Sequence, residues 1–241
     1  MRRLSVRTIT ALLLFCVLFF TFPSKALPEV FVPDIITIKG GKVMLTAEIR
    51  GRFFGRGGEV VEFSVDGKTL GKFLSGGDGV ASATFLPRKA SLYRIAVRAG
   101  KDEGHGLLLS LAKASGIVFV DVEASLMEEF FSGKPRQGSQ AAIKDIQRRF
   151  PVVFLQTGLL STKVVKAWLK EHGFIESPVL PWREGAVFDD ISGKGFRTRA
   201  VIGGPNVIES AKEYATSAFS FEETENSAEV KDWEEIRKNL R

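Results

Sequence analysis

The chain lacks cysteine outside its first residues. Cys16 is the only one in 241 residues. It lies in a segment, Met1–Ala26, that has arginines at its start, an apolar run over 9–22 and small residues at its end. This pattern predicts a secretory signal peptide that is cleaved after Ala26. Because cleavage removes Cys16, we expect the mature protein to have no disulfide, no reactive thiol and no cysteine-bound metal.

A long hydrophobic run is also missing. The apolar stretch over 9–22 is shorter than the roughly 20 residues that a transmembrane helix needs. We therefore expect a periplasmic or extracellular protein of a bacterial envelope. The alternative is that the stretch over 9–22 is retained and anchors the protein in the inner membrane. The sequence leaves open whether the mature protein is free or tethered.

The mature chain has no large excess of charge of either sign. The net charge of +6 includes four basic residues of the predicted signal peptide, which contains no acid. Without them, 30 of the 34 basic residues face 28 acidic ones, and the net charge falls to +2. Since nucleic-acid-binding proteins carry a clear excess of Lys and Arg, we expect no nucleic-acid partner.

Short β-prone segments separated by turn signals fill residues 28–112. Seven of them occur within roughly 80 residues, and Asp66-Gly67 indicates a tight hairpin turn between two of them. The pattern predicts a small antiparallel β-sandwich, and its turn order resembles that of immunoglobulin-like domains of bacterial cell-surface proteins. His105, between two glycines, is expected in an exposed loop. The alternating segments include 43–49, 60–65 and 92–97.

Strands and helices alternate over residues 116–241, which we assign to a second domain. Buried strands are predicted at 116–120, 152–155, 199–202 and 218–221, and helices at 139–149, 162–172, 206–214 and 230–236. Such alternation predicts an α/β domain with a parallel sheet and helices on its faces. The fold class is therefore a β-sandwich followed by a Rossmann-like α/β domain.

Polar side chains follow the first two strands of the predicted parallel sheet. Asp121 and Glu123 come directly after the first strand, and Thr157 and Gly158 follow the second. Ligands of open α/β sheets bind at the carboxyl ends of the strands, so these residues mark a candidate site. The alternative interpretation is that the two acids only cap the turn that follows their strand.

With these blocks in this order, residues 116–221 resemble the haloacid-dehalogenase-like (HAD) superfamily of phosphohydrolases. In that superfamily the first strand ends in Asp-x-Asp, the second ends in Thr or Ser, and a lysine precedes a late strand. The segment Val153–Gly158, followed by Val165–Gly173 and Ser177–Leu180, looks most like the lipin and actin-patch phosphatidate phosphatase branch. The resemblance implies phosphate chemistry that depends on Mg²⁺.

The resemblance also implies roles for individual residues. Asp121 is the implied nucleophile and magnesium ligand, and Glu123 is the implied acid/base. Thr157 is the implied hydrogen-bond donor to the phosphate. Lys194 is the implied phosphate-side cation, with Arg197 or Arg199 as substitutes.

One motif of the superfamily is altered. Where the superfamily keeps Gly-Asp and a further Asp for the metal, this chain has Gly203-Gly-Pro-Asn206. Asn206 is then left as a neutral magnesium ligand, and Asp189 and Asp190 are the nearest paired acids that could replace the missing carboxylates from a loop.

Three functions are compatible with these observations. The first is an exported envelope protein, a pseudoenzyme whose phosphatase-like site is eroded and which binds a phosphate ligand or a partner. The second is an active Mg²⁺-dependent phosphatase acting on phosphatidate or a small phosphomonoester. The third is a structural or adhesive envelope protein. The choice between a phosphorylated small molecule and a phospholipid, the protein partner and the oligomeric state stay open.

Overall fold

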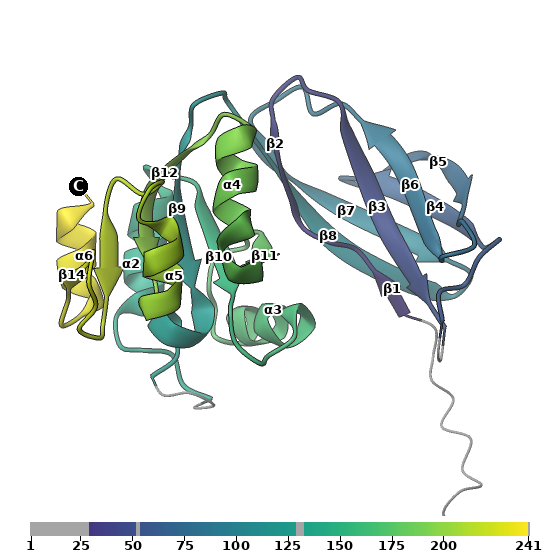
Figure 1. The fold of residues 1–241 in the computed structure, drawn as a ribbon. Helices are drawn as coiled ribbons and strands as arrows, with labels where there is room; N and C mark the ends of the chain where they lie inside the picture. The colour runs from purple at the N-terminus through teal and green to yellow at the C-terminus, as the bar shows by residue number, and fades with distance from the viewer. Residues whose placement is uncertain (1–28, 52–53, 129–132, 241) are drawn as a thin grey trace, which may run out of the picture.

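The computed structural model describes residues 29–51, 54–128 and 133–240 (Figure 1). The predicted signal peptide, 1–26, and the alternative anchor, 9–22, lie outside the described residues. Within the described part of the chain, no helix is long and apolar enough to cross a membrane. An all-β region comes first and an α/β region follows it, and the short segment 112–115 connects them.

The all-β region is a sandwich of two sheets. One has the strand order β1-β3-β6 and the other β2-β8-β7-β4-β5. Every pairing is antiparallel except the one between β2 and β8, and the arrangement is immunoglobulin-like, as the turn pattern predicts. The strands are β1 (Glu29–Phe31), β2 (Ile35–Ile38), β3 (Val43–Arg50), β4 (Val60–Val65), β5 (Lys68–Leu74), β6 (Val80–Phe85), β7 (Ser91–Ala99) and β8 (Asp102–Leu111).

Alternation along the strands builds the sandwich core. On β4, Val61, Phe63 and Val65 are buried, while the residues between them are partly exposed. This period of two places one face of each strand against the opposite sheet. The expectation of a loop at His105 is wrong, because β8 begins at Asp102 and includes it, although its side chain is exposed as expected.

The α/β region is built on one six-stranded parallel sheet with the order β11-β10-β9-β12-β13-β14. Its strands are β9 (Gly116–Asp121), β10 (Val152–Gln156), β11 (Val179–Pro181), β12 (Arg197–Ile202), β13 (Ala218–Ser220) and β14 (Ala228–Glu229). Counted along the chain, this is the order 3-2-1-4-5-6 of doubly wound folds, in which the winding reverses between β9 and β12.

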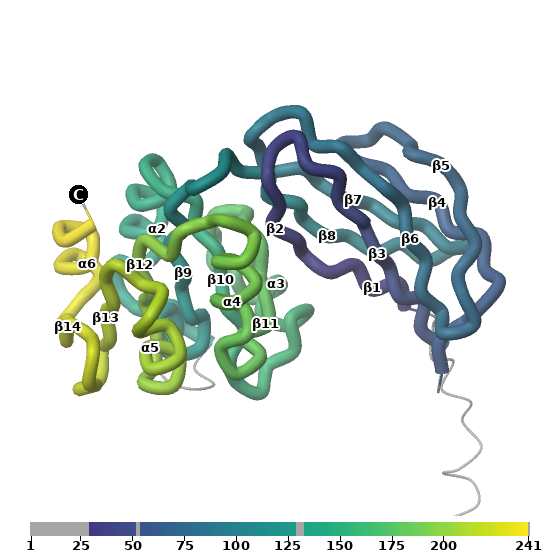
Figure 2. Tube along the Cα trace, turned by 45° about the horizontal axis from the view of Figure 1, so that its top comes forward, coloured from purple at the N-terminus to yellow at the C-terminus, as the bar shows by residue number. Residues whose placement is uncertain are grey.

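Helices cover both faces of the parallel sheet (Figures 1 and 2). Successive side chains of β9 point to opposite faces, so Val118 and Val120 contact the layer of α2, α3 and α6, and Ile117 and Phe119 contact the layer of α4 and α5. The helices are α2 (Ser139–Gln147), α3 (Thr162–Glu171), α4 (Ala186–Gly193), α5 (Pro205–Ala211) and α6 (Trp233–Asn239), with a π-helical turn η1 (Val122–Leu126) and a 3₁₀ turn η2 (Arg183–Gly185).

The region around Asp189 and Asp190 differs from the prediction. We expected a loop there, but both acids lie on α4 and are exposed. Phe188 and Ile191 of the same helix are fully buried against the sheet. The sequence has too few periodic apolar positions here to indicate a helix. Helix α4 is stabilised instead by the packing of these two side chains on the sheet.

A buried carboxylate joins the two regions. Asp34, between β1 and β2, accepts hydrogen bonds from the backbone N–H groups of Leu107 on β8 and Val179 on β11, both at 2.8 Å. Its Oδ1 atom also lies 2.6 Å from Nζ of Lys166 on α3. β11 is an edge strand of the parallel sheet, so the sandwich covers an edge that would otherwise present unpaired backbone groups. Ile36 belongs to the same apolar cluster as the buried side chains of α4, so the two regions share a core.

Candidate functional site

The carboxyl ends of β9, β10 and β12 meet at the point where the winding of the sheet reverses. A cavity of about 350 Å³ lies there, and Asp121, Glu123, Thr157 and Asn206 all line it. The structure therefore brings these four sequence-predicted residues together. They meet because carboxyl ends of neighbouring parallel strands lie on one edge of a sheet.

Both oxygens of Asp121 accept hydrogen bonds from the protein itself. Oδ1 accepts from the Thr157 hydroxyl at 2.7 Å and from the N–H groups of Glu123 and Ala124 at 3.1 and 3.2 Å. Oδ2 accepts a longer bond from Gly204 N–H at 3.4 Å. Asp121 is thus the N-cap of η1 and also connects β9 to the loops that follow β10 and β12.

Both oxygens of Glu123 also accept hydrogen bonds from the backbone. Its Oε2 atom accepts from the N–H groups of Thr157, at 3.2 Å, and Gly158. Its Oε1 atom accepts from Leu160 N–H at 3.1 Å. The carboxylate approaches the loop after β10 so closely that a Cβ atom at position 158 would lie 2.6 Å from Oε1, which explains the glycine there.

Burial governs the charge of this site. Asp121 is only 2% exposed, and this burial is the main cause that raises the pKa of its carboxyl above the ordinary value, against the lowering effect of the Thr157 hydrogen bond.

Glu128 and Glu222 also line the cavity. Arg136 is its one basic residue among the described lining, and its guanidinium lies 4.3 Å from the centre of the Phe221 ring. The lining is therefore predominantly acidic.

Mg²⁺ does not fit this set of residues. Magnesium needs several oxygen ligands in an octahedral array, whereas the oxygens of Asp121 and Glu123 already accept hydrogen bonds from backbone N–H groups or from Thr157. Asn206 is exposed on the rim of the cavity. In the described ranges, no three His, Cys, Asp or Glu side chains are grouped so that they could hold a metal ion.

Lys194 lies at the opposite edge of the sheet. It follows α4 and precedes β12, so it is at the amino end of that strand, and it pairs with Asp190 at 2.7 Å. Arg197 and Arg199 are at the start of the same strand. The expected phosphate-side cations are therefore separated from Asp121 by the length of β12. Asp189, which accepts a hydrogen bond from Tyr214, and Asp190 do not line the cavity either.

Sequence reasoning missed other residues of the cavity. Trp182 lines it and donates a hydrogen bond from Nε1 to the Ser210 hydroxyl at 3.0 Å. Glu128, Arg136 and Glu222 come from segments without a recognisable motif, and only the path of the chain brings them to this edge. The spacing of the sequence contains no signal that could have identified them.

Comparisons with known proteins do not show a family. No family model matches the chain, and no curated protein matches it. Among solved structures, it matches the D00-D0 domain of intimin (11% identity, 38% of this chain and 51% of that one, TM-score 0.31). It also matches the CARDB domain of a Pyrococcus furiosus protein (12% identity, 36% and 94%, TM-score 0.27) and the M1 domain of titin (15% identity, 35% and 95%, TM-score 0.27). The match thus spans about half of the intimin fragment.

The resemblance of residues 116–221 to HAD phosphohydrolases is contradicted. No family model supports it, and none of the solved structures named above is a HAD phosphohydrolase. The HAD assignment is therefore wrong, and the phosphatase and hydrolase descriptions that came from it lack support. The similarity rested in part on strand-end acids and a strand-end threonine, and such residues also cap the turns that follow strands. What the structure does show is the coarser feature, a six-stranded parallel sheet.

Proposed function

We propose that the protein is an exported envelope protein that acts by binding another protein, with the sandwich as its principal contact surface. The observation that carries this proposal is the state of Asp121 and Glu123. Carboxylates that accept several backbone N–H bonds connect the loops that donate those bonds. Here the two carboxylates accept hydrogen bonds that hold the loops after β9, β10 and β12.

The acidic lining of the cavity supports a non-catalytic role as well. Four carboxylates line it and one described arginine accompanies them. An anionic ligand would meet repulsion there, which makes a phosphate compound a poor candidate for this cavity. The sandwich offers a better surface for a partner.

Exposed apolar side chains are concentrated on the sandwich. Of the seven large hydrophobic residues that are exposed in the described chain, five belong to it. Val60 and Leu74 are directly opposite each other on β4 and β5 and are 55% and 69% exposed, and Phe54 is 85% exposed. All three lie at the sandwich end where β4 begins and β5 ends. Exposed apolar groups of this kind are typical of surfaces that contact another protein.

A pair of double variants tests the proposal. We would express the full chain in a bacterium and measure its recovery with the envelope fraction after washing in roughly 0.5 M salt, which screens electrostatic attraction. Phe54→Ser with Leu74→Ser should lower the recovery severalfold. The matched control, Leu159→Ser with Val164→Ser, removes two exposed apolar side chains of 83% and 48% exposure from the α/β region and should leave it unchanged.

Two results would overturn the proposal. Equal recovery of both double variants and the unchanged protein would remove the sandwich as the contact surface. Turnover of a small-molecule substrate that Asp121→Asn abolishes, with the variant still folded, would replace binding by catalysis.

A further inference from the structure

The amino edge of the parallel sheet is basic. Lys113 precedes β9, Arg148 and Arg149 precede β10, and Lys194 and Arg197 lie at the start of β12. Since β10, β9 and β12 are neighbours in the sheet, the loops that carry these residues lie side by side. Backbone hydrogen bonds connect them, from Ala114 N–H to the Gly195 carbonyl and from Val118 N–H to the Pro151 carbonyl.

Two turns of the sandwich extend this basic edge. Lys39 N–H donates to the carbonyl of Leu111, the last residue before the connecting segment, and Gly40 N–H donates to the Pro87 carbonyl. The β2–β3 turn and the β6–β7 turn are therefore at the same end of the molecule as the connection (upper side of Figure 1). These turns contribute Lys39, Lys42, Arg88 and Lys89, all of which are exposed.

Most of these cations have no carboxylate partner. The segments 39–42, 86–90, 112–115, 148–151 and 192–199 contain no Asp or Glu. The neighbouring acids Asp145 and Asp190 pair with Arg148 and Lys194. Seven exposed cations make no ion pair within the described ranges, and we call them the basic end: Lys39, Lys42, Arg88, Lys89, Lys113, Arg149 and Arg197.

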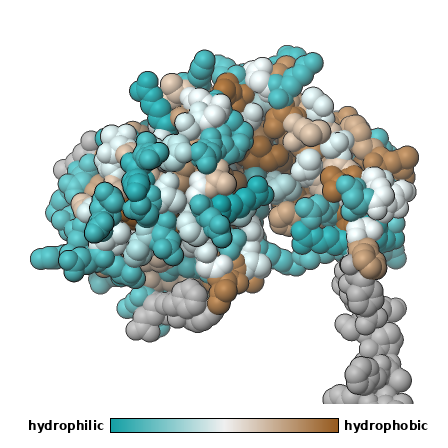
Figure 3. Space-filling view, viewed as in Figure 1, coloured by the Kyte–Doolittle hydropathy of each residue, from teal (hydrophilic) through white to brown (hydrophobic). Residues whose placement is uncertain are grey.

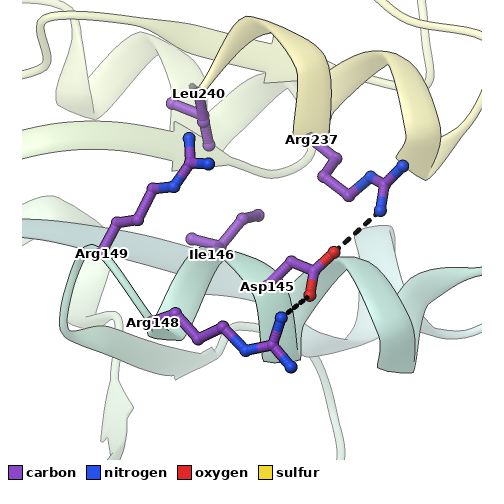
Figure 4. A pocket seen from close by; sticks show the side chains of 6 residues that line it. All are labelled: Asp145, Ile146, Arg148, Arg149, Arg237 and Leu240. Carbon is purple, nitrogen blue, oxygen red and sulfur yellow. Dashed lines mark hydrogen bonds and ion pairs between the residues drawn. The ribbon is translucent and has the colours of Figure 1, made fainter.

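Figure 4 shows the contrast between a paired and an unpaired arginine at this edge. A cavity of about 280 Å³ lies beside the contact between the end of α2 and α6. On one side of it, Asp145 accepts from Arg148 at 3.0 Å and from Arg237 at 2.8 Å. Arg149 extends on the other side toward Leu240 and makes no ion pair with a described carboxylate, although its charge helps to lower the pKa of Asp145. Its charge is therefore available to an outside anion.

Apolar side chains accompany the cations. Met44, near the start of β3, is 63% exposed, and Leu86, directly after β6, is 40% exposed. Met44 is opposite Thr84 in the sheet, so Leu86 is its diagonal neighbour on the outer face. Figure 3 shows hydrophobic residues beside hydrophilic ones on this upper side of the molecule. Cations around a few exposed apolar groups are the composition of surfaces that attach to lipid bilayers.

We propose that the basic end binds the phosphate groups of an anionic phospholipid surface, with Met44 and Leu86 entering between the headgroups. The seven cations come from five separate loops of both regions, so they cannot converge on one phosphate. They match a layer of many phosphates instead. Lipid binding here is separate from the protein contact proposed for the opposite end of the sandwich.

Vesicle sedimentation with purified residues 27–241 tests the proposal. We expect the protein to sediment with vesicles that contain roughly 30% anionic phospholipid at low salt, and to be released as salt is raised. The quadruple variant with Lys39, Lys89, Arg149 and Arg197 changed to Ser should bind the vesicles roughly 100-fold more weakly than the unchanged protein does. Met44→Ser with Leu86→Ser, which leaves the charge unchanged, should weaken binding severalfold at low salt.

A second quadruple variant is the control, because it loses the same number of positive charges as the first. It replaces Lys72, Lys101, Lys170 and Lys231, exposed lysines outside the basic end and again two from each region, by Ser. We expect this control to bind as the unchanged protein does. Equal losses in the two quadruple variants would mean that only net charge matters and would overturn the proposal, provided that thermal unfolding shows both to be folded.

Three further arms separate lipid from other anions. Equal sedimentation with purely zwitterionic vesicles would overturn the proposal. Competition by inorganic phosphate, beyond that by chloride of the same ionic strength, would indicate a site for single phosphates and would also overturn it. Tighter binding to a labelled DNA duplex than to vesicles, at equal phosphate concentration, would assign the basic end to nucleic acid instead.

Discussion

The two edges of the parallel sheet use charge in opposite ways. At the carboxyl edge, Asp121 and Glu123 are buried and accept hydrogen bonds from the backbone of three loops. At the amino edge, Arg149 and Arg197 are exposed and have no ion pair in the described structure. Charges that hold loops together are required by the fold, whereas exposed charges without a partner are available to a ligand. At the carboxyl edge, the acids that the sequence marked as a candidate site connect the loops of the fold.

The largest expected effect comes from removing the acceptor at the carboxyl edge. Asp121→Ala leaves the Thr157 hydroxyl and the N–H groups of Glu123 and Ala124 without their partner in a buried place. We expect a loss of about 3 kcal/mol in the free energy of unfolding, measured by denaturant titration. Asp121→Asn keeps one acceptor oxygen and should lose clearly less. A change below about 0.5 kcal/mol in Asp121→Ala would contradict the structural role.

A smaller loss is expected from closing the space beside Glu123. Gly158→Ala places a Cβ atom 2.6 Å from Oε1 of Glu123, so the loop after β10 must shift. We expect the free energy of unfolding, measured by denaturant titration, to fall by about 2 kcal/mol. Gly133→Ala, whose Cβ atom would meet nothing within 4 Å, is the control and should be nearly neutral. If the two substitutions behaved alike, the close contact with Glu123 would be unimportant.

The pH dependence of stability gives a finer test of the buried charge. The pKa of Asp121 is raised in the folded protein, mainly by burial. The folded state then binds the proton more tightly than the unfolded state does, so this group adds stability as the pH falls from above its raised pKa toward the ordinary value of about 4. Relative to Asp121→Asn, the unchanged protein should gain stability in that window. A difference between the two proteins that stays constant with pH would contradict the raised pKa.

The smallest effect on stability is expected at the amino edge. Arg149→Ser and Arg197→Ser remove exposed cations that have no ion pair in the described chain, so the free energy of unfolding should change by less than about 0.5 kcal/mol. Arg237→Ser, which breaks contacts with Asp145 and Glu234, should cost more than either. A loss above about 1 kcal/mol at Arg149 would show that the edge is structural there too.

The candidate site was predictable only in part. The apolar run before Asp121 and the run before Thr157 indicated two buried strands, and the rule for parallel sheets placed their ends together. Lys194 was misplaced because the order of residues along the chain does not say at which end of β12 a preceding lysine lies. Once α4 is recognised, that position is clearly the amino end.

The sequence by itself determined the local patterns of this protein. Alternation predicted the strands of the sandwich, and apolar runs followed by helical periodicity predicted the parallel sheet, because side-chain burial repeats with the period of each element. Only the tertiary structure decided what the charges do. The groups that reach Asp121 depend on the paths of loops that are far apart in the sequence. So does the lack of an ion pair at Arg149 among the described residues, and no local pattern contains that information.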